Sequence, residues 1–260
     1  MHEIAKLTGP EVAARLAAGA AVVLPLGSLE THGPQAPMGD YLMAAEISRR
    51  IAAAAGDRGT DALVLPPIPF GGEDYFAGVP GGIELPGALL QTLVEEVLSR
   101  LVATGCRRLL VVNGHAGSIG PVEAAARALR RRHGVAVPSL HLWRVAGAMH
   151  AELGGPASSL GHGGDPVYSV ALHLVPELCR PERAGPRAAE AAFLGLPISN
   201  FGTVRCEGVE FSAPIVVAEN APGGVACGDS RGASAERGAA MVERIVAAGA
   251  AMLVQLKAVT

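Results

Sequence analysis

Short apolar runs without polar alternation constrain the fold of this chain more than any other feature. The clearest is Ala21–Leu26, and we expect further strands at Ala62–Pro66, Arg108–Val112 and Val135–Leu142. A continuous apolar run of this length is typical of a strand that is buried on both faces of a mostly parallel sheet. The sequence therefore predicts a central sheet covered on both sides.

Segments with helical signals separate these runs. We expect helices at about Tyr41–Ala55, Pro86–Ala103, Pro121–Arg132 and Ala233–Leu256. Because strands and helices alternate, the pattern favours βαβ units with helices on both faces of the sheet. We therefore predict an α/β fold, a three-layer α/β/α sandwich. Since no internal repeat or low-complexity linker interrupts the chain, we take residues 1–260 as a single domain.

Charge and composition argue against several partners. The formal net charge is −3, and Lys and Arg gather only at Arg107–Arg108 and Arg130–His133, so we do not expect nucleic acid as a partner. The sequence contains no run of about 18 apolar residues, so we do not expect a membrane-spanning segment. The N-terminus lacks a signal-peptide pattern, and the four cysteines show no CxxC spacing. We expect reduced thiols and a cytoplasmic protein.

The segment Gly27–Asp40, directly after the first predicted strand, carries two acids and a histidine. Ligands of parallel α/β sheets bind at the carboxyl ends of strands. Glu30 and His32 are two residues apart, so in an extended segment they project to the same side, and Asp40 can return from the start of the next helix. This set suits Zn, Mn or Fe. Alternatively, the segment is a polar turn in which Asp40 caps that helix.

A second candidate ligand lies in Asn113–Ser118, which follows another predicted strand. Gly114 and Gly117 permit close approach of the backbone, and His115 stands at the carboxyl end of the strand. A histidine in this position can simply be hydrogen-bonded. Its place beside the first cluster in the predicted sheet favours a ligand.

A third cluster, Leu160–Pro166, precedes an apolar helix predicted at Val167–Leu174. Three glycines surround His162 and Asp165, which indicates that the backbone shape of this turn serves a site. Asp165 before Pro166 also fits the start of a helix that the aspartate caps. Both interpretations can hold, because a capping carboxylate can still present an oxygen to a metal.

Together these segments resemble the creatininase family, also called creatinine amidohydrolases. Its members typically carry a Gly-Ser-x-Glu-x-His-Gly-Pro segment, an Asn-Gly-His segment and a later His-containing glycine turn. The matching segments here are Gly27–Pro34, Asn113–His115 and Gly161–Asp165, with support from Phe70–Gly72 and Gly224–Asp229. The resemblance covers nearly the whole chain. It implies a binuclear metal-dependent amidohydrolase with two divalent ions (Zn, Mn or Fe), commonly assembled as a homohexamer.

The resemblance also implies roles for individual residues. The implied metal ligands are Glu30, His32, Asp40, His115 and Asp165. Asp40 would bridge the two ions, and a water shared between them would attack the carbonyl carbon. His162 would face the substrate and donate a proton to the departing nitrogen. Asp40 and His162 are therefore the expected catalytic residues.

Several positions depart from the family pattern, among them Gln35, where a histidine is common, and Ser118, where an asparagine is common. Gly117 stands where creatininase itself has an acidic metal ligand, and Val167 stands where many relatives have a glutamate. Asp165 could replace the missing carboxylate. These departures disfavour creatinine as the substrate.

The leading functional hypothesis is a hydrolase that acts on a C–N bond, of cyclic amide or formamide type, in a small molecule. A second is a peptidase of a modified peptide, as family members in mycofactocin maturation are understood to be. Relatives suspected of cleaving a C–C bond in keto-inositols leave the bond type open. From another class, a catalytically silent metal-binding oligomer is the alternative. The loops Gly71–Gly82 and Ile198–Cys227 should shape the pocket.

Overall fold

The computed structural model describes residues 1–72, 79–187, 192–200, 202–216 and 228–259. A four-stranded sheet in the order β2-β1-β5-β6 forms its centre, and all neighbouring strands in it are parallel. The strands are β1 (Ala21–Leu26), β2 (Ala62–Val64), β5 (Leu109–Asn113) and β6 (Ser139–His141). All four overlap the segments predicted to be strands: β1 has the predicted bounds, and β5 ends one residue later than predicted.

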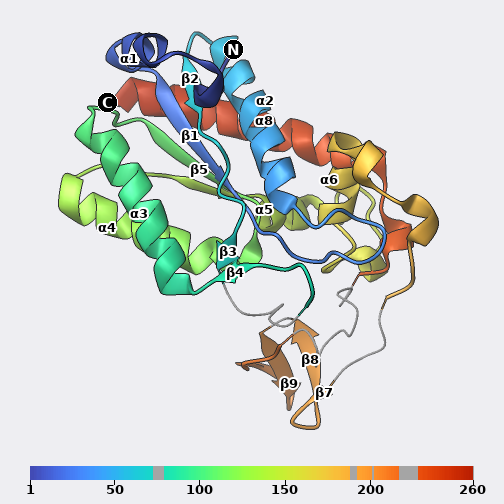
Figure 1. Cartoon of the computed structure of the whole chain (residues 1–260). Helices are drawn as coiled ribbons and strands as arrows, with labels where there is room; N and C mark the ends of the chain where they lie inside the picture. Colours follow the sequence, from blue (N-terminus) through green and yellow to red (C-terminus); the bar gives the residue numbers. More distant parts are fainter. Residues whose placement is uncertain (73–78, 188–191, 201, 217–227, 260) are drawn as a thin grey trace.

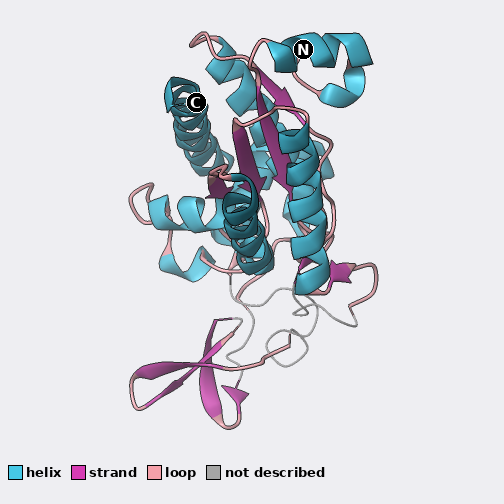
Figure 2. Cartoon of the chain, turned by 90° about the vertical axis from the view of Figure 1, so that its left-hand side faces the viewer, coloured by secondary structure: helices cyan, strands magenta, loops and turns pink. Residues whose placement is uncertain are grey.

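Helices cover both faces of this sheet (Figures 1 and 2). One face packs against α2 (Asp40–Gly56), α5 (Leu142–Met149), α6 (Val167–Leu174) and α8 (Ala235–Val259), and the other against α3 (Gly87–Ala103) and α4 (Ile119–His133). Side chains of β1 alternate between the two layers, with Val23 on the α2 side and Val22 and Leu24 on the α3 side. The predicted three-layer α/β/α sandwich with a mostly parallel sheet is confirmed.

The strand register places two of the three clusters side by side. Leu26, the last residue of β1, lies opposite Asn113, the last residue of β5. Both strands therefore end at the same edge of the sheet. Glu30 lies in the loop after β1, and His115 lies in the loop after β5. A short N-terminal helix, α1 (Gly9–Ala17), lies at the opposite end of β1.

Part of the chain was predicted to be loop and forms strands. An antiparallel sheet is built from β7 (Ala192–Phe193), β8 (Leu196–Asn200), β9 (Thr203–Cys206) and β10 (Val209–Ser212), and it projects from the sandwich (Figure 1). Residues 209–212 of β10 alternate apolar and polar side chains, but all four are exposed and the run is too short to distinguish a strand from a loop. The short pair β3 (Gly71–Gly72) and β4 (Glu84–Leu85) and the helix α5 were likewise not predicted.

The C-terminal helix α8 is long and apolar enough, by length and composition, to cross a membrane. It packs along α6 and α2, and Met241, Ile245 and Leu253 are buried in the core. The buried part of its apolar surface thus packs within the sandwich.

Candidate metal centre

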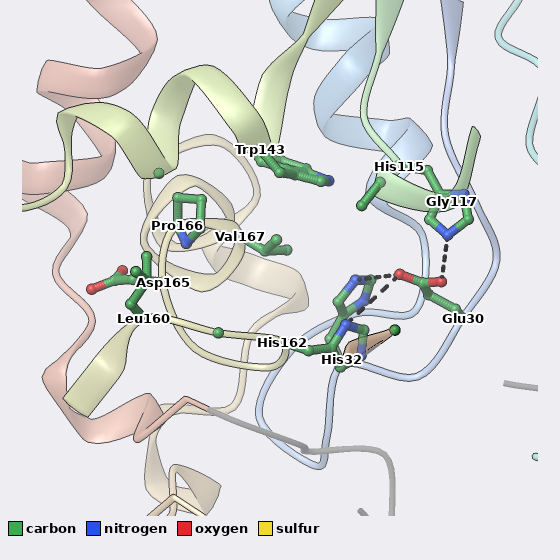
Figure 3. A pocket seen from close by; sticks show the side chains of 14 residues that line it. Glu30, His32, His115, Gly117, Trp143, Leu160, His162, Asp165, Pro166 and Val167 are labelled. Atoms are coloured by element: carbon green, nitrogen blue, oxygen red, sulfur yellow. Dashed lines mark ion pairs between the residues drawn. The ribbon is translucent and has the colours of Figure 1, made fainter. Parts of the chain in front are cut away.

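Glu30 lies at the middle of a buried group of imidazoles at the carboxyl edge of the sheet (Figure 3). Its Oε1 atom is 3.3 Å from His32 Nε2 and 4.0 Å from His162 Nδ1. Its Oε2 atom is 3.0 Å from His115 Nε2. All three sequence clusters thus contribute a side chain to one site.

Backbone carbonyls fix the orientation of two of these rings. His32 Nδ1 lies 3.2 Å from the carbonyl oxygen of Pro37, and His162 Nε2 lies 2.6 Å from that of Thr31. Since a carbonyl only accepts, each of these nitrogens carries the hydrogen, and the other ring nitrogen faces Glu30 Oε1. The two rings stack with centroids 4.8 Å apart. A metal-binding histidine usually donates the N–H of its other ring nitrogen to a carbonyl or carboxylate oxygen in this way.

His115 is held by its own loop. The Asn113 side chain accepts a hydrogen bond from the backbone N–H of His115 at 3.0 Å and donates one to its carbonyl at 2.8 Å. His115 Nδ1 is 2.8 Å from Ser118 Oγ, which leaves Nε2 toward Glu30. Gly71 packs directly against the imidazole, and a Cβ atom there would collide with Nδ1.

Asp40 is fully buried as the first residue of α2, and Gly39 before it takes the N-cap position. Its Oδ1 atom accepts a hydrogen bond from the backbone N–H of Ser28, and its Oδ2 atom lies 3.4 Å from Trp143 Nε1. Asp40 therefore does not cap the helix. It lies close enough to Glu30, His32 and His115 for their charges to affect one another.

The pKa values reflect this crowding of charge. Burial on its own would raise the pKa of Glu30, but the adjacent His115 and His32 outweigh burial and hold it well below its ordinary range. Burial, with the charge of Glu30, raises the pKa of Asp40 to about 7. Burial opposes protonation of His115, but the charge of Glu30 outweighs burial and raises the pKa of His115 to about 9. For His162 burial prevails and lowers the pKa to about 4. Two carboxylates and basic imidazoles thus share protons in a buried space.

Asp165, the fifth ligand expected from the sequence, is not brought to this group. Its carboxylate accepts hydrogen bonds from Ser159, Ser169 and Arg237, and His150 Nε2 lies 3.0 Å away. Figure 3 shows it turned away from Glu30. The residue is completely buried, so these partners replace water as its solvation. Nor does it cap α6, whose N-cap is Pro166.

The residues present fit a divalent cation. Among the described residues, Glu30, His32 and His162 bring one possible ligand atom each to within 4.8 Å of one another. Glu30 Oε2 is buried and has no hydrogen bond of good geometry. Imidazole nitrogen and carboxylate oxygen are ligands that Zn and similar ions accept. His162, expected from the sequence to be a proton donor, lies within this potential ligand set.

A cavity of about 440 Å³ opens on the group. Its lining includes Glu30, His32, His115, Ala116, Gly117, Trp143, Gly147, Leu160, Gly161, His162, Asp165, Pro166, Val167 and Gly202. Trp143 was not singled out from the sequence. The signal available was that the only tryptophan of the chain directly follows a predicted strand. Of the two loops expected to shape the pocket, Gly202 is in the lining, whereas residues 73–78 and 217–227 lie outside the described part of the chain.

Comparison with known proteins identifies the family. The family model described as creatinine amidohydrolase (Creatininase) matches residues 5–253. A mycofactocin precursor peptide peptidase of Mycobacterium ulcerans is 32% identical over 180 residues, which are 66% of each protein. A creatinine amidohydrolase of Pseudomonas putida is 36% identical over 138 residues, 49% of this chain and 50% of that protein. The matched part thus spans between half and two thirds of these two relatives.

Solved structures extend the likeness to nearly the full length. A crystal structure of creatinine amidohydrolase (creatininase) superimposes with a TM-score of 0.78 at 28% identity, covering 97% of this chain and 96% of that one. A creatininase variant described as the Zn-Zn type gives a TM-score of 0.76 at 27% identity, with 97% of both chains covered. The family match, the fold and the arrangement of Glu30 with its imidazoles lead to one conclusion: the chain belongs to the creatininase family of hydrolases.

Proposed function

We propose that this protein is a metal-dependent hydrolase of a small molecule, cleaving a C–N bond of cyclic amide or formamide type. The observation that carries the proposal is the arrangement of His32 and His162, each oriented by a backbone carbonyl so that its remaining ring nitrogen faces Glu30. Such an arrangement is of little use for packing and suits a bound cation. The alternative of a silent metal-binding oligomer shares this site, so turnover decides between them.

Different residues of the site would bind the metal ion and transfer the proton. Glu30, His32 and His162 would hold one ion, which when bound polarises a carbonyl oxygen and acidifies a neighbouring water. Asp40 is the further catalytic candidate, because its carboxylate is fully buried and lies beside Glu30, His32 and His115. Its hydrogen bonds from Ser28 and Trp143 keep the carboxylate in place.

A second ion is part of the proposal. Glu30 presents Oε1 to His32 and His162 and Oε2 to His115, so its two oxygens face separate imidazole groups. His115 and the buried Asp40 are the ligands available on that second side. Asp165 is left out of the ligand set because its carboxylate is occupied elsewhere.

The similar proteins leave a peptide bond open as the target. A mycofactocin precursor peptide peptidase matches 66% of this chain at 32% identity, and a creatinine amidohydrolase matches 49% at 36% identity. A peptidase acting on a modified peptide is therefore the second candidate. The homohexamer expected from the resemblance stays a prediction, and light scattering on the purified protein tests it.

Metal content and turnover test the proposal together. We expect close to two ions per chain by elemental analysis, and hydrolysis within a panel of lactams, N-formyl amino acids and a short C-terminal peptide. Glu30→Gln keeps the shape of the side chain but removes its charge, and should lose both metal and turnover. Glu46→Gln is the matched control, since Glu46 pairs with Arg49 and Arg50 on the surface of α2. Unchanged metal content in Glu30→Gln would refute the assignment.

A further inference from the structure

The cavity beside Glu30 has two chemically different ends. The cluster Glu30, His32, His115 and His162 forms the polar end. The rest of the described lining is mostly apolar or lacks a side-chain functional group: Trp143, Val167, Pro166, Leu160, Ala116, Gly117, Gly147 and Gly202. Figure 3 shows Val167 and Trp143 between the polar cluster and Asp165. A substrate that places its reacting bond at the polar end must place its neighbouring group against the apolar one.

No Lys or Arg belongs to the described lining, so a negatively charged substituent at the apolar end would find no side chain to act as its counterion. Among the described residues at this end Asp165 is the one acid, and its carboxylate is turned away and held by Arg237, Ser159 and Ser169. It is therefore unavailable to pair with a cationic substituent. Burying an ion without a partner is strongly unfavourable.

Trp143 and Val167 supply the apolar contact. The indole N–H of Trp143 is shared between the carbonyl oxygen of Gly114 and Asp40 Oδ2, so the donor is occupied and the ring is the group that lines the cavity. Val167 is the first residue of α6, is 7% exposed and has no polar atom in its side chain. A cavity of about 440 Å³ is at the small end of ligand sites, enough for an amide group with one substituent of side-chain size.

From this lining we infer that the substrate carries an uncharged, apolar group next to the bond that is cleaved, and that Val167 is a specificity-determining residue for that group. The inference rests on the proposed function, which places the cleaved bond at the polar end of the cavity. It narrows the substrate class to amides with an aliphatic or aromatic substituent. Small amides whose substituent is ionic are disfavoured.

Trp143 provides the readout, because it is the single tryptophan of the chain and lines the cavity. We would titrate the metal-loaded protein with two cyclic amides of similar reach, 5-isobutylhydantoin and hydantoin-5-acetic acid, and follow tryptophan fluorescence. The apolar probe should bind at least tenfold more tightly than the anionic one. Val167→Lys should reduce that ratio at least tenfold by supplying a counterion. Val167→Thr, nearly equal in shape, should reduce it about threefold.

Val209→Thr is the matched control, since Val209 is 58% exposed on β10 and outside the cavity lining, and it should leave the ratio unchanged. Equal affinity for the two probes, or binding of neither, would overturn the inference, as would a ratio unchanged by Val167→Lys. Circular dichroism of each variant verifies folding. Failure of the proposed function is recognised separately, by the absence of bound metal in the parent protein.

Discussion

The guanidinium of Arg237 lies 2.8 Å from the carboxylate of Asp165, and the two join the start of α8 to the residues just before α6. Asp165 is completely buried, and the Arg237 side chain is 11% exposed. The backbone of Asp165 also forms hydrogen bonds with Ser159 and Gly161, which both precede His162, and so closes the turn that carries this histidine. The ion pair thus supports the shape of one wall of the site.

Removing the buried cation of Arg237 should lower the free energy of unfolding more than removing an exposed arginine. Arg237→Met leaves the buried Asp165 carboxylate without its guanidinium, and we expect a loss of about 3 kcal/mol in the free energy of unfolding. Arg244→Met is the control on the same helix, because Arg244 forms a 2.8 Å pair with the exposed Glu152 and should cost less than about 1 kcal/mol. Thermal unfolding followed by circular dichroism compares the two. Equal effects would show that the buried pair contributes nothing special.

Metal content separates ligands from supporting residues. Asp165→Asn should retain the metal content of the parent protein, since this carboxylate does not face Glu30, although its stability should fall. His162→Ala should lower the metal content, because it removes a nitrogen directed at Glu30 Oε1. Elemental analysis after gel filtration measures both. Loss of metal in Asp165→Asn with metal retained in His162→Ala would reverse the assignment.

Gly71 provides a test of how tightly His115 is held. A methyl group at Gly71 would collide with the His115 ring, so Gly71→Ala should displace the imidazole and weaken metal binding by about 10–100-fold, the range seen when the support of a ligand is lost. Gly120→Ala is the control, since a Cβ atom there meets no other group within 4 Å. Metal titration by calorimetry gives the affinities. An unaffected Gly71→Ala would mean that the loop yields without disturbing the site.

The dependence of stability on pH can be predicted at a site away from the metal centre. Hydrogen bonds from Arg15 lower the pKa of Asp61 below its ordinary 3.8. A lowered pKa contributes stability above pH 3.8 that is lost as the pH falls through the folded-state value. The pair is partly exposed, so Asp61→Asn should cost no more than about 1 kcal/mol at pH 7 and progressively less below pH 3.8. Urea unfolding at several pH values, with the exposed Asp57→Asn as control, measures this; a constant difference would contradict it.

The sequence predicted the central layer well because burial there is uniform. Ala21–Leu26 is buried at every position, and the strand has the bounds that the apolar run indicates. The helix Val167–Leu174 was likewise located correctly, since apolar residues follow a proline that starts it. The neighbouring parallel strands β1 and β5 bring Glu30 and His115 to one edge of the sheet. The alternation of strands and helices in the sequence was enough to predict this.

The direction of individual side chains could not be predicted in this way. Asp165 has a residue type and a position that suit a metal ligand, but Arg237, 72 residues further along the chain, determines where its carboxylate points. His162 faces Glu30 because its other nitrogen meets the carbonyl of Thr31, 131 residues away. Contacts over such separations leave no local pattern. The strands of the projecting sheet were missed because they are short and carry few buried residues, Val204 in β9 being buried and β10 exposed throughout.

The pair between Asp165 and Arg237 also sets an order of events during synthesis. Arg237 is near the start of the last helix, so the turn bearing His162 lacks its buried counterion until that helix has been made and packed against α6. A nascent chain that already contains Glu30, His32 and His115 is therefore without the support of this wall. The turn that carries His162 thus obtains its buried counterion from a helix that is synthesised 72 residues later than Asp165.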